Sequence, residues 1–420
     1  MRFIITGGKR LSGEVEVRGA KNSALKAFAA SLLFENPITV KNVPDIEDVS
    51  RMRELLEALG VSVTPLVRRM VKIDAHGLSG NKLKKDIAEQ FRGSIVLAGP
   101  LLARTGSVLF PHPGGCVIGK RPIDLFLKGW RAFGANIEET KSGYELTAKK
   151  LKGADITFRV VSVTGTEALM MTAVLAEGKT LLRNAACEPE IPSLAEFLNR
   201  SGAKITGAGT STIEIIGTGG KMLKARRPFE VIPDRIEAGT FLILGAALGK
   251  SVKIKNCNPE HLSALIAALR DAGAKIDIGP RSLVVRRPKQ LFARSITTRE
   301  YPGFMTDLQA PFTVLMTQAH GESLVFETIF EGRLNYVEEL NRMGAHIVTA
   351  DPHRVFVHGP TPLHGRDVAS PDLRAGLAFV IAGLIARGES VIRNVYQIDR
   401  GYEHIETRLQ KLGADIRREK

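Results

Sequence analysis

ALRDAGAKI (residues 268–276) is a helix-to-strand junction, and five further copies of it organise the chain. In each copy an amphipathic helical segment ends at a glycine, and the apolar residues that follow begin a strand. Glycine is favoured there because the left-handed backbone that ends a helix costs it little. The glycines recur every 68 to 74 residues, which predicts six structural repeats. The other copies are LLEALGVSV (55–63), GWRAFGANI (129–137), FLNRSGAKI (197–205), ELNRMGAHI (339–347) and RLQKLGADI (408–416).

A second helical segment lies upstream of each junction, and its residues are small and apolar on every side. Such a segment predicts a buried helix. Each repeat of about 70 residues therefore reads helix, strand, helix, strand. We predict an α/β protein with two domains of three repeats, one formed by residues 21–232 and the other by residues 1–20 with 233–420. The segments are ALKAFAASLL, SIVLAGPLLA, ALMMTAVLAE, FLILGAALG, FTVLMTQAH and LAFVIAGLIA.

Polar or charged residues stand at the predicted amino ends of the six buried helices. Each lies 19 to 21 residues before a common point of the repeat, which is Asn in four copies. Helix amino ends carry unpaired N–H groups and a partial positive charge. Capping explains part of this set, but a cation opposes the helix dipole, so the basic members favour a bound anion. The six residues are Lys21, Arg92, Thr164, Arg235, Asp307 and Arg374, and the common points are Asn42, Pro111, Asn184, Asn256, Glu327 and Asn394.

The stretch PHPGGCVIGKRPID (111–124) carries the chain's most reactive group. Its glycines and prolines predict a flexible loop rather than a helix or strand. Cys116 is followed by Lys120 and Arg121, and neighbouring cations favour the thiolate form of a cysteine. The alternative is an inert cysteine on a surface loop. We expect the two remaining cysteines, Cys187 and Cys257, to be buried and unreactive.

The composition narrows the possible partners and location. The net charge is +15, which raises nucleic acid, an acidic membrane face or anionic small molecules as partners. The basic residues form only short clusters, so a solvated basic surface explains most of the charge. Three cysteines indicate a reducing compartment. We find no signal peptide and no apolar run long enough for a membrane span, and we expect a cytoplasmic protein that needs no metal and no cofactor.

Several motifs together resemble the UDP-N-acetylglucosamine 1-carboxyvinyltransferases, a family of enolpyruvyl transferases. The resemblance covers the whole chain and implies a two-domain inverse α/β barrel, in agreement with the count of repeats. The motifs are GAKNSAL (19–25), RGSIVLAGPLLAR (92–104), PGGCVIGKRPIDL (113–125), NAACEPEI (184–191), VIPDRIEAGTF (231–241), YPGFMTDLQA (301–310), DLRAG (372–376) and DRGYE (399–403).

The resemblance implies transfer of the enolpyruvyl group of phosphoenolpyruvate to the 3-hydroxyl of UDP-N-acetylglucosamine, with release of phosphate. This reaction opens peptidoglycan synthesis and so supports cell-wall formation, cell shape and division; the family is the target of fosfomycin. No sequence pattern assigns an oligomeric state.

Individual roles follow from the matched motifs. Cys116 would give the proton to C3 of phosphoenolpyruvate, Asp307 would take the proton of the sugar hydroxyl, and Arg374 would support the closed form. The residues expected to bind phosphoenolpyruvate are Lys21, Asn22, Arg121 and Arg400, of which Lys21 also counts as catalytic. Those expected to bind the nucleotide sugar are Arg92, Arg121, Pro122, Ile123, Asp124, Leu125, Ser162, Val163, Asp307 and Ile329.

Four points remain open at this stage. Thr306 and Asp307 also fit a capping box, in which Asp307 would be an ordinary first-turn carboxylate. Pro311 falls in the helix expected after Asp307, where it would remove a backbone bond or shift the start of the helix. For the whole chain, 5-enolpyruvylshikimate-3-phosphate synthase shares the fold but lacks the cysteine loop. A basic repeat protein that binds nucleic acid is supported only by the net charge.

Overall fold

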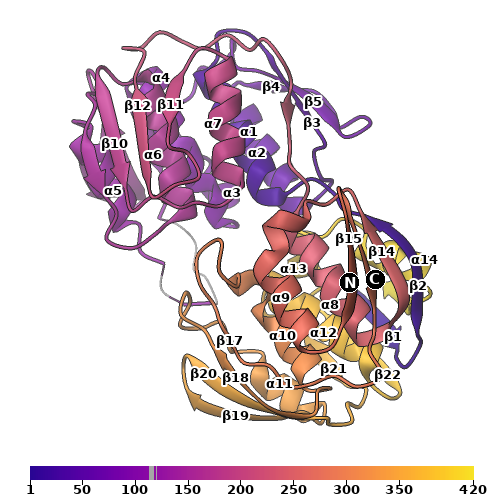
Figure 1. Ribbon diagram of the computed structural model, residues 1–420. Helices are drawn as coiled ribbons and strands as arrows, with labels where there is room; N and C mark the ends of the chain where they lie inside the picture. The colour runs from indigo at the N-terminus through magenta and orange to yellow at the C-terminus, as the bar shows by residue number, and fades with distance from the viewer. Residues whose placement is uncertain (113–117, 120) are drawn as a thin grey trace. The chain divides into compact units, whose positions relative to one another are not determined.

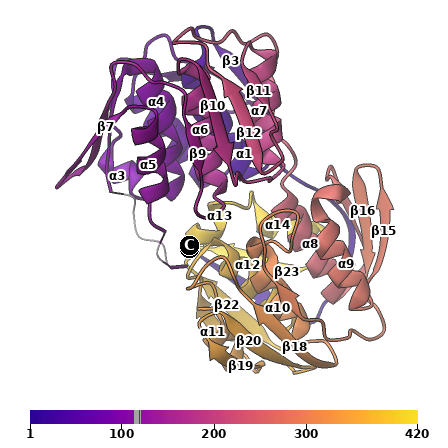
Figure 2. The same cartoon turned by 60° about the vertical axis from the view of Figure 1, so that its left-hand side comes forward.

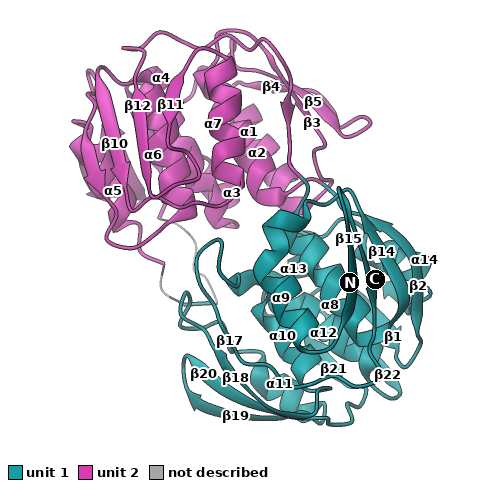
Figure 3. Cartoon of the chain, viewed as in Figure 1, with its two compact units in different colours: residues 1–18, 117–120, 233–420 teal, residues 19–116, 121–232 magenta. Residues whose placement is uncertain are grey.

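The computed structural model describes residues 1–112, 118–119 and 121–420. The chain forms two compact units, which Figure 3 colours separately. Unit 1 holds residues 1–18, 117–120 and 233–420, and unit 2 holds residues 19–116 and 121–232. Each unit has a hydrophobic core of its own. Among the described residues, no helix has both the length and the apolar character needed to cross a bilayer.

Unit 2 has three buried helical segments with sheets and outer helices around them (Figure 1). The buried segments are α1 (Lys21–Ala30) with η1 (Ser31–Leu33), η2 (Arg92–Leu97) with α4 (Ala98–Thr105), and α6 (Val163–Leu175). The outer helices are α2 (Glu47–Ala58), α3 (Lys85–Ala88), α5 (Asp124–Ala132) and α7 (Glu190–Arg200).

The sheets of unit 2 hold one repeat each. In sheet order, the first is β13 (Phe229–Glu230), β3 (Ile38–Lys41), β5 (Met70–Asp74) and β4 (Ser62–Val63). The second is β6 (Ser107–Phe110), β8 (Gly143–Thr147) and β7 (Asn136–Thr140). The third is β11 (Lys204–Thr206), β12 (Thr212–Ile216), β10 (Lys179–Arg183) and β9 (Asp155–Thr157).

Unit 1 repeats the plan with α8 (Arg235–Leu248), η4 (Thr306–Leu308) with α10 (Gln309–Met316), and α12 (Leu373–Ile385) as buried segments. Every residue of α8 and α10 is buried. Figure 2 shows the outer helices of this unit beside the sheets. The outer helices are η3 (Pro259–Leu262), α9 (Ser263–Asp271), α11 (Val337–Arg342), α13 (Tyr396–Asp399) and α14 (Ile405–Lys411).

Its three sheets have four strands each. The first in sheet order is β15 (Lys275–Gly279), β16 (Ser282–Arg286), β14 (Gly249–Lys255) and β2 (Leu11–Glu16). The second is β17 (Ile296–Thr297), β18 (Gly321–Phe326), β20 (Arg354–Gly359) and β19 (His346–Asp351). The third is β21 (Asp367–Ala369), β22 (Glu389–Arg393), β1 (Arg2–Thr6) and β23 (Asp415–Glu419).

A common strand order relates the repeats. Five of the sheets contain a short strand that either precedes the buried segment of its repeat or is added from another part of the chain. This strand pairs in parallel with the strand that follows the buried segment, as β9 pairs with β10. The next two strands of the repeat add antiparallel partners, as β12 and β11 do. In the sixth repeat the N-terminal strand β1 fills one of these positions, antiparallel to β22 and β23. The last repeat is therefore completed by the start of the chain.

The repeat junctions have the backbone that the sequence predicts. All six glycines have positive φ, between 89° and 113°. The structure adds a second left-handed position, the asparagine after the first strand of four repeats. Its side-chain amide donates to the carbonyl just past the short strand, which fixes that strand beside its neighbour. The four pairs are Asn42 with Val231, Asn184 with Phe158, Asn256 with Val17 and Asn394 with Ser370.

Close packing explains two features inside the buried helices. A Cβ on Gly99 would lie 2.3 Å from Oγ1 of Thr172 and 2.8 Å from the Ala168 carbonyl, so only glycine lets α4 approach α6 this closely. Pro100 and Pro311 are each the third residue of their helices, α4 and α10. The first-turn N–H groups of a helix have no α-helical partner, so these prolines remove no such bond. Pro311 does place a 3-10 turn, η4, ahead of α10.

Candidate active site

In unit 2 the start of α1 presents the predicted phosphoenolpyruvate-binding residues Lys21 and Asn22. Lys21 is the first residue of the helix, and its Nζ lies 3.1 Å from Oδ2 of Asp48 on α2. The Asp48 carboxylate is 5% exposed, and the Lys21 side chain is 13% exposed. A buried carboxylate from an outer helix therefore holds a partly accessible ammonium group at the end of a buried helix.

The predicted nucleotide-sugar residues of unit 2 gather around the starts of the other two buried segments. Arg92 begins η2 and donates from Nη2 to the Pro122 carbonyl at 3.2 Å. Ser162 caps α6 by accepting from the Gly165 N–H at 3.1 Å. Leu125 lies against Gly165, because a Cβ there would be 2.5 Å from its Cδ1. The segment 121–125 is thus brought next to Arg92 and to the Ser162–Val163 pair.

Cys116 lies outside the described residues, as does Lys120. The other two thiols fit a structural role. Burial raises the pKa of Cys257 to about 11, and Cys257 is buried as expected. Cys187 is half-buried, where we expected it to be buried. Its thiol pKa is raised, mainly by burial and to a smaller extent by the nearby negative charge of Glu188. A raised pKa keeps a thiol protonated and weakly nucleophilic.

In unit 1 the 3-10 turn η4, just ahead of α10, carries Asp307 within a set of arginines. Nε of Arg374 donates to Oδ1 of Asp307 at 2.7 Å, and Nη2 of Arg333 lies 3.4 Å from the same oxygen. Both guanidinium groups are almost fully buried, whereas the Asp307 side chain is 30% exposed. Arg374 also donates to the Tyr402 hydroxyl at 3.3 Å. Residues distant in sequence thus converge on one carboxylate that remains accessible.

These arginines set the acidity of Asp307. Burial on its own would raise the pKa of this carboxyl, but Arg374, Arg333 and Arg235 more than offset it and hold the pKa well below its usual range. Asp307 is therefore ionised at every physiological pH. Its side chain makes no capping bond, since neither η4 nor α10 has a side-chain cap. Asp307 does stand in the first turn of η4, but the Thr306 hydroxyl donates to Glu327 and accepts from Arg333 rather than capping the helix.

The remaining predicted residues of unit 1 lie on neighbouring elements. Ile329 follows β18, and its N–H donates to Oε1 of Glu327 at 2.8 Å. Arg400 is the residue after α13, a helix that packs against α12 and hence near the element carrying Arg374. Nη1 of Arg400 donates to Oε1 of Gln397 at 3.1 Å. The structure therefore brings Asp307 and Arg374 into contact and places Ile329 and Arg400 on adjoining segments.

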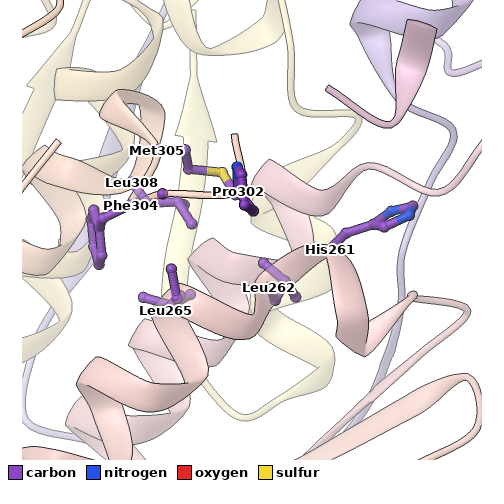
Figure 4. Close-up of a pocket in the computed structure, with 9 residues that line it drawn as sticks. His261, Leu262, Leu265, Pro302, Phe304, Met305 and Leu308 are labelled. Atoms are coloured by element: carbon purple, nitrogen blue, oxygen red, sulfur yellow. The ribbon is translucent and has the colours of Figure 1, made fainter. Parts of the chain in front are cut away.

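A small pocket lies beside Leu308, the residue after Asp307 (Figure 4). Apolar side chains from η3, from α9 and from the segment before η4 line most of it. Met305 from this lining also accepts from Nη1 of Arg235 at 3.4 Å. Apart from His261, the lining consists of apolar side chains and a glycine, which does not favour an anion site. The residues are His261, Leu262, Ala264, Leu265, Pro302, Gly303, Phe304, Met305 and Leu308.

A buried ion pair in unit 2 is a feature that the sequence analysis missed. Nζ of Lys26 on α1 lies 3.0 Å from Oε2 of Glu167 on α6, and the side chains are 7% and 0% exposed. Burial raises the pKa of Glu167 to about 7; Lys26 opposes this change, and Glu190 and Glu188 add to it. A lysine and a glutamate inside two apolar helical segments were the available signal. Periodicity does not show that they meet.

The comparisons with known proteins agree with this arrangement. The family model for EPSP synthase (3-phosphoshikimate 1-carboxyvinyltransferase) matches residues 5–409. The chain is 48% identical to the UDP-N-acetylglucosamine 1-carboxyvinyltransferase of Acidobacterium capsulatum over 99% of this chain and 96% of that protein. It is 45% identical to the protein of that name from Campylobacter hominis, over 99% and 98%.

The chain belongs to the UDP-N-acetylglucosamine 1-carboxyvinyltransferase family. It is therefore a transferase. Among solved structures, the enolpyruvyl transferase NikO from Streptomyces tendae is 26% identical, with a TM-score of 0.89 over 99% of this chain and 98% of that one. EPSP synthase from Acinetobacter baumannii is 19% identical, with a TM-score of 0.77 over 99% of each chain, and shows the shared fold. The predicted two-domain α/β fold of the enolpyruvyl transferases is confirmed.

Proposed function

We propose that this family member transfers the enolpyruvyl group of phosphoenolpyruvate to the 3-hydroxyl of UDP-N-acetylglucosamine and releases phosphate. The observation that carries the proposal is the full-length identity of 44% to 48% with relatives that bear the carboxyvinyltransferase name. The same proposal places the protein in the cytoplasm, at the first committed step of peptidoglycan synthesis. It also makes the chain a target of fosfomycin.

Unit 2 supports this function by its cations. Both substrates are polyanionic, and fixed positive charges offset the repulsion between them. Lys21, Asn22 and Arg121 hold phosphoenolpyruvate in this proposal, with Arg400 from unit 1. Arg92, the segment 121–125, Ser162 and Val163 hold the nucleotide sugar with Ile329. The Ser162 N-cap and the segment 121–125 that packs against it give this surface a fixed geometry.

Unit 1 supplies Asp307, one of the two groups that the proposal uses to move protons. The sugar hydroxyl oxygen forms a bond to C2 of phosphoenolpyruvate, while C3 receives a proton from Cys116. The hydroxyl proton goes to Asp307. The bond between C2 and the phosphate oxygen then breaks, C3 returns a proton to the Cys116 thiolate, and the proton held by Asp307 leaves with the phosphate, so that the enol ether remains. In this scheme Arg374 also supports the closed form of the enzyme.

The low pKa of Asp307 suits a late proton transfer. A carboxylate so stabilised by Arg374 and Arg333 is too weak a base to ionise a free alcohol. Once the oxygen–carbon bond begins to form, however, the hydroxyl becomes strongly acidic, and a weak base then suffices. Before that point Asp307 orients the hydroxyl by accepting its hydrogen bond. Asp307 is in the active, ionised form throughout the neutral pH range.

Product analysis tests this proposal. The purified protein is mixed with phosphoenolpyruvate and, in parallel reactions, UDP-N-acetylglucosamine or shikimate 3-phosphate. We expect a new nucleotide sugar whose mass has increased by one enolpyruvyl group, and no product from shikimate 3-phosphate. Transfer to shikimate 3-phosphate instead would assign the chain to the sister activity. Tight, salt-sensitive binding of duplex DNA without any transfer would support the nucleic-acid alternative.

A further inference from the structure

Glu327 stands at a repeat position where four other copies have an asparagine. The residue after the first strand is Asn42, Asn184, Asn256 or Asn394 in those copies, always with φ near 54°. Each of these asparagines donates to the carbonyl just past a short strand. Glu327 follows β18 at the equivalent place, but its φ is not positive. A carboxylate also cannot donate that bond.

The next residue, Thr328, makes the missing contact. Its Oγ1 donates to the carbonyl of Thr298, the residue just past the short strand β17, at 2.5 Å. Its N–H donates to Oγ1 of Thr298 at 2.8 Å. The strand is thus held without the side chain at position 327. In this repeat Thr328 makes the contact that the asparagine makes in the other copies. The presence of a glutamate at position 327 therefore needs another explanation.

The Glu327 carboxylate contacts two segments of the candidate site. Oε1 accepts from the N–H groups of Ile329 and Phe330, at 2.8 and 3.1 Å. Oε2 accepts from Oγ1 of Thr306, the residue before Asp307, at 2.9 Å. The side chain is 0% exposed, so it does not meet substrate. Its two oxygens connect the Asp307 turn to the segment that carries Ile329.

A second connection runs through Arg333. Nε of Arg333 donates to Oγ1 of Thr306 at 3.2 Å, and its Nη2 lies 3.4 Å from Oδ1 of Asp307. Thr306 therefore gives its proton to Glu327 and accepts from Arg333, which fixes the direction of both bonds. The chain of contacts from Glu327 through Thr306 and Arg333 to Asp307 has a fixed polarity only while position 327 is a pure acceptor.

We propose that Glu327 is a positioning residue that holds the Asp307 turn and the Ile329 segment at a fixed separation for binding the acceptor sugar. The inference rests on the proposed function, because that function makes Asp307 and Ile329 contacts of the sugar. A displacement of about 1 Å between a reacting group and its partner lowers turnover by up to ~100-fold. Loss of Glu327 therefore affects turnover and nucleotide-sugar binding together.

Steady-state kinetics on the full chain tests the inference with Glu327→Ala, Glu327→Gln and a matched control, Asn256→Ala. Asn256 stands at the same repeat position, holds β2 through Val17, and is not part of the site. We expect Glu327→Ala to lower kcat by about 10- to 100-fold and to raise KM for UDP-N-acetylglucosamine, with KM for phosphoenolpyruvate unchanged. Glu327→Gln keeps an oxygen for Ile329 and Phe330 and recovers part of the loss. Asn256→Ala loses stability but keeps wild-type kinetics.

The outcomes separate the two proposals. A wild-type chain that forms no enolpyruvyl product overturns the proposed function. An active wild type, together with Glu327→Ala that matches Asn256→Ala in kcat and both KM values, overturns only the positioning role. If Glu327→Ala does not fold, Thr306→Val replaces it, because valine has the same shape and lacks the connecting hydroxyl. We expect a lower kcat for that variant, and wild-type kinetics would again overturn the inference.

Discussion

The two units build similar helix ends but hold their charges differently. In unit 2, outer groups hold each basic residue at a buried-helix start: Asp48 contacts Lys21, and the Pro122 carbonyl contacts Arg92. In unit 1 the starts of two buried segments contact each other, since Arg374 at the start of α12 pairs with Asp307 in η4, just ahead of α10. The helix starts of unit 2 are therefore suited to binding anions. Those of unit 1 are suited to setting the pKa of one carboxylate, Asp307.

The buried charges of the two units also differ in acidity. Glu167 in unit 2 has a pKa raised to about 7, because burial and two nearby carboxylates outweigh one lysine. Asp307 in unit 1 has a pKa held below its usual range, because arginines outweigh burial. The number and type of facing cations thus decide which effect dominates at each site. The predictions below test this contrast, beginning with the largest effect.

Fosfomycin should abolish activity completely. Opening of its epoxide needs a thiolate, and its phosphonate needs cations such as Lys21, Arg121 and Arg400. We expect one adduct per chain at Cys116, formed faster with UDP-N-acetylglucosamine present, and none on Cys187 or Cys257. Intact mass and peptide mapping measure this.

The matched variant is Cys116→Asp. It should be immune to the epoxide and should still turn over, because a carboxylic acid can deliver the proton to C3 if its pKa is raised in the closed site. An adduct on another cysteine, or activity that survives treatment of the wild type, would remove Cys116 from its assigned role.

Asp307→Asn should lower kcat by at least ~100-fold, the usual scale for loss of a general base. The variant should still fold and bind both substrates. Its melting temperature should fall, because Arg374 and Arg333 lose their shared counter-charge. Phosphate release and thermal unfolding measure the two effects.

Asp351→Asn is the control for this substitution. Asp351 lies in the same unit and pairs with Arg354 at 2.6 Å on the surface. We expect unchanged kinetics and only a slight loss of stability, because exposed ion pairs contribute little. Near-normal turnover of Asp307→Asn would leave Asp307 with a structural role only.

Glu167→Gln should flatten the pH dependence of stability in the acid-to-neutral range. The pKa of Glu167 is about 7 in the folded state, against 4.5 for an ordinary glutamate, so the folded state binds the extra proton between these values. The contribution of Glu167 to the free energy of unfolding is therefore complete below pH 4.5. It falls as the pH rises toward 7, by no more than about 1.4 kcal/mol per pH unit. Urea unfolding of wild type and variant across this range measures the difference. Parallel curves would show that Glu167 is not protonated there.

The helix caps should give the smallest effect. Asp372→Ala in unit 1 removes a carboxylate that accepts from the Arg374 and Ala375 N–H groups, at 2.8 and 3.2 Å, and faces Arg333. Ser162→Ala in unit 2 removes a single bond, to the Gly165 N–H. We expect losses of about 2 and about 1 kcal/mol respectively, within the range measured for N-caps. Equal losses would mean that the extra contacts of Asp372 add nothing.

Much of the fold could be predicted because its signals are local. A glycine after an amphipathic helix needs only its own backbone to be recognised, and all six have positive φ. The site could be predicted only in part, because its contacts are long-range. Arg333 and Arg374 meet Asp307 across 26 and 67 residues of sequence. Nothing in the sequence around Asp307 indicated that two buried guanidinium groups would lower its pKa.

Glu327 shows the same limit in another form. The repeat analysis identified its position as the common point of six copies, yet gave no reason for the change from Asn to Glu. That reason is visible only when Thr306 and the Ile329 N–H are seen beside the carboxylate. A departure from an internal repeat is thus a useful signal for function, but the partners must be known before it can be interpreted.

Phosphate release tests the central claim most directly. Phosphoenolpyruvate is supplied at saturation, and the rate of phosphate release is followed with and without UDP-N-acetylglucosamine. We predict release that requires the nucleotide sugar, saturates with its concentration and matches the formation of the enolpyruvyl product mole for mole. Release that is absent with both substrates, or that is equally fast without the nucleotide sugar, would contradict the assignment of this chain as a UDP-N-acetylglucosamine enolpyruvyl transferase.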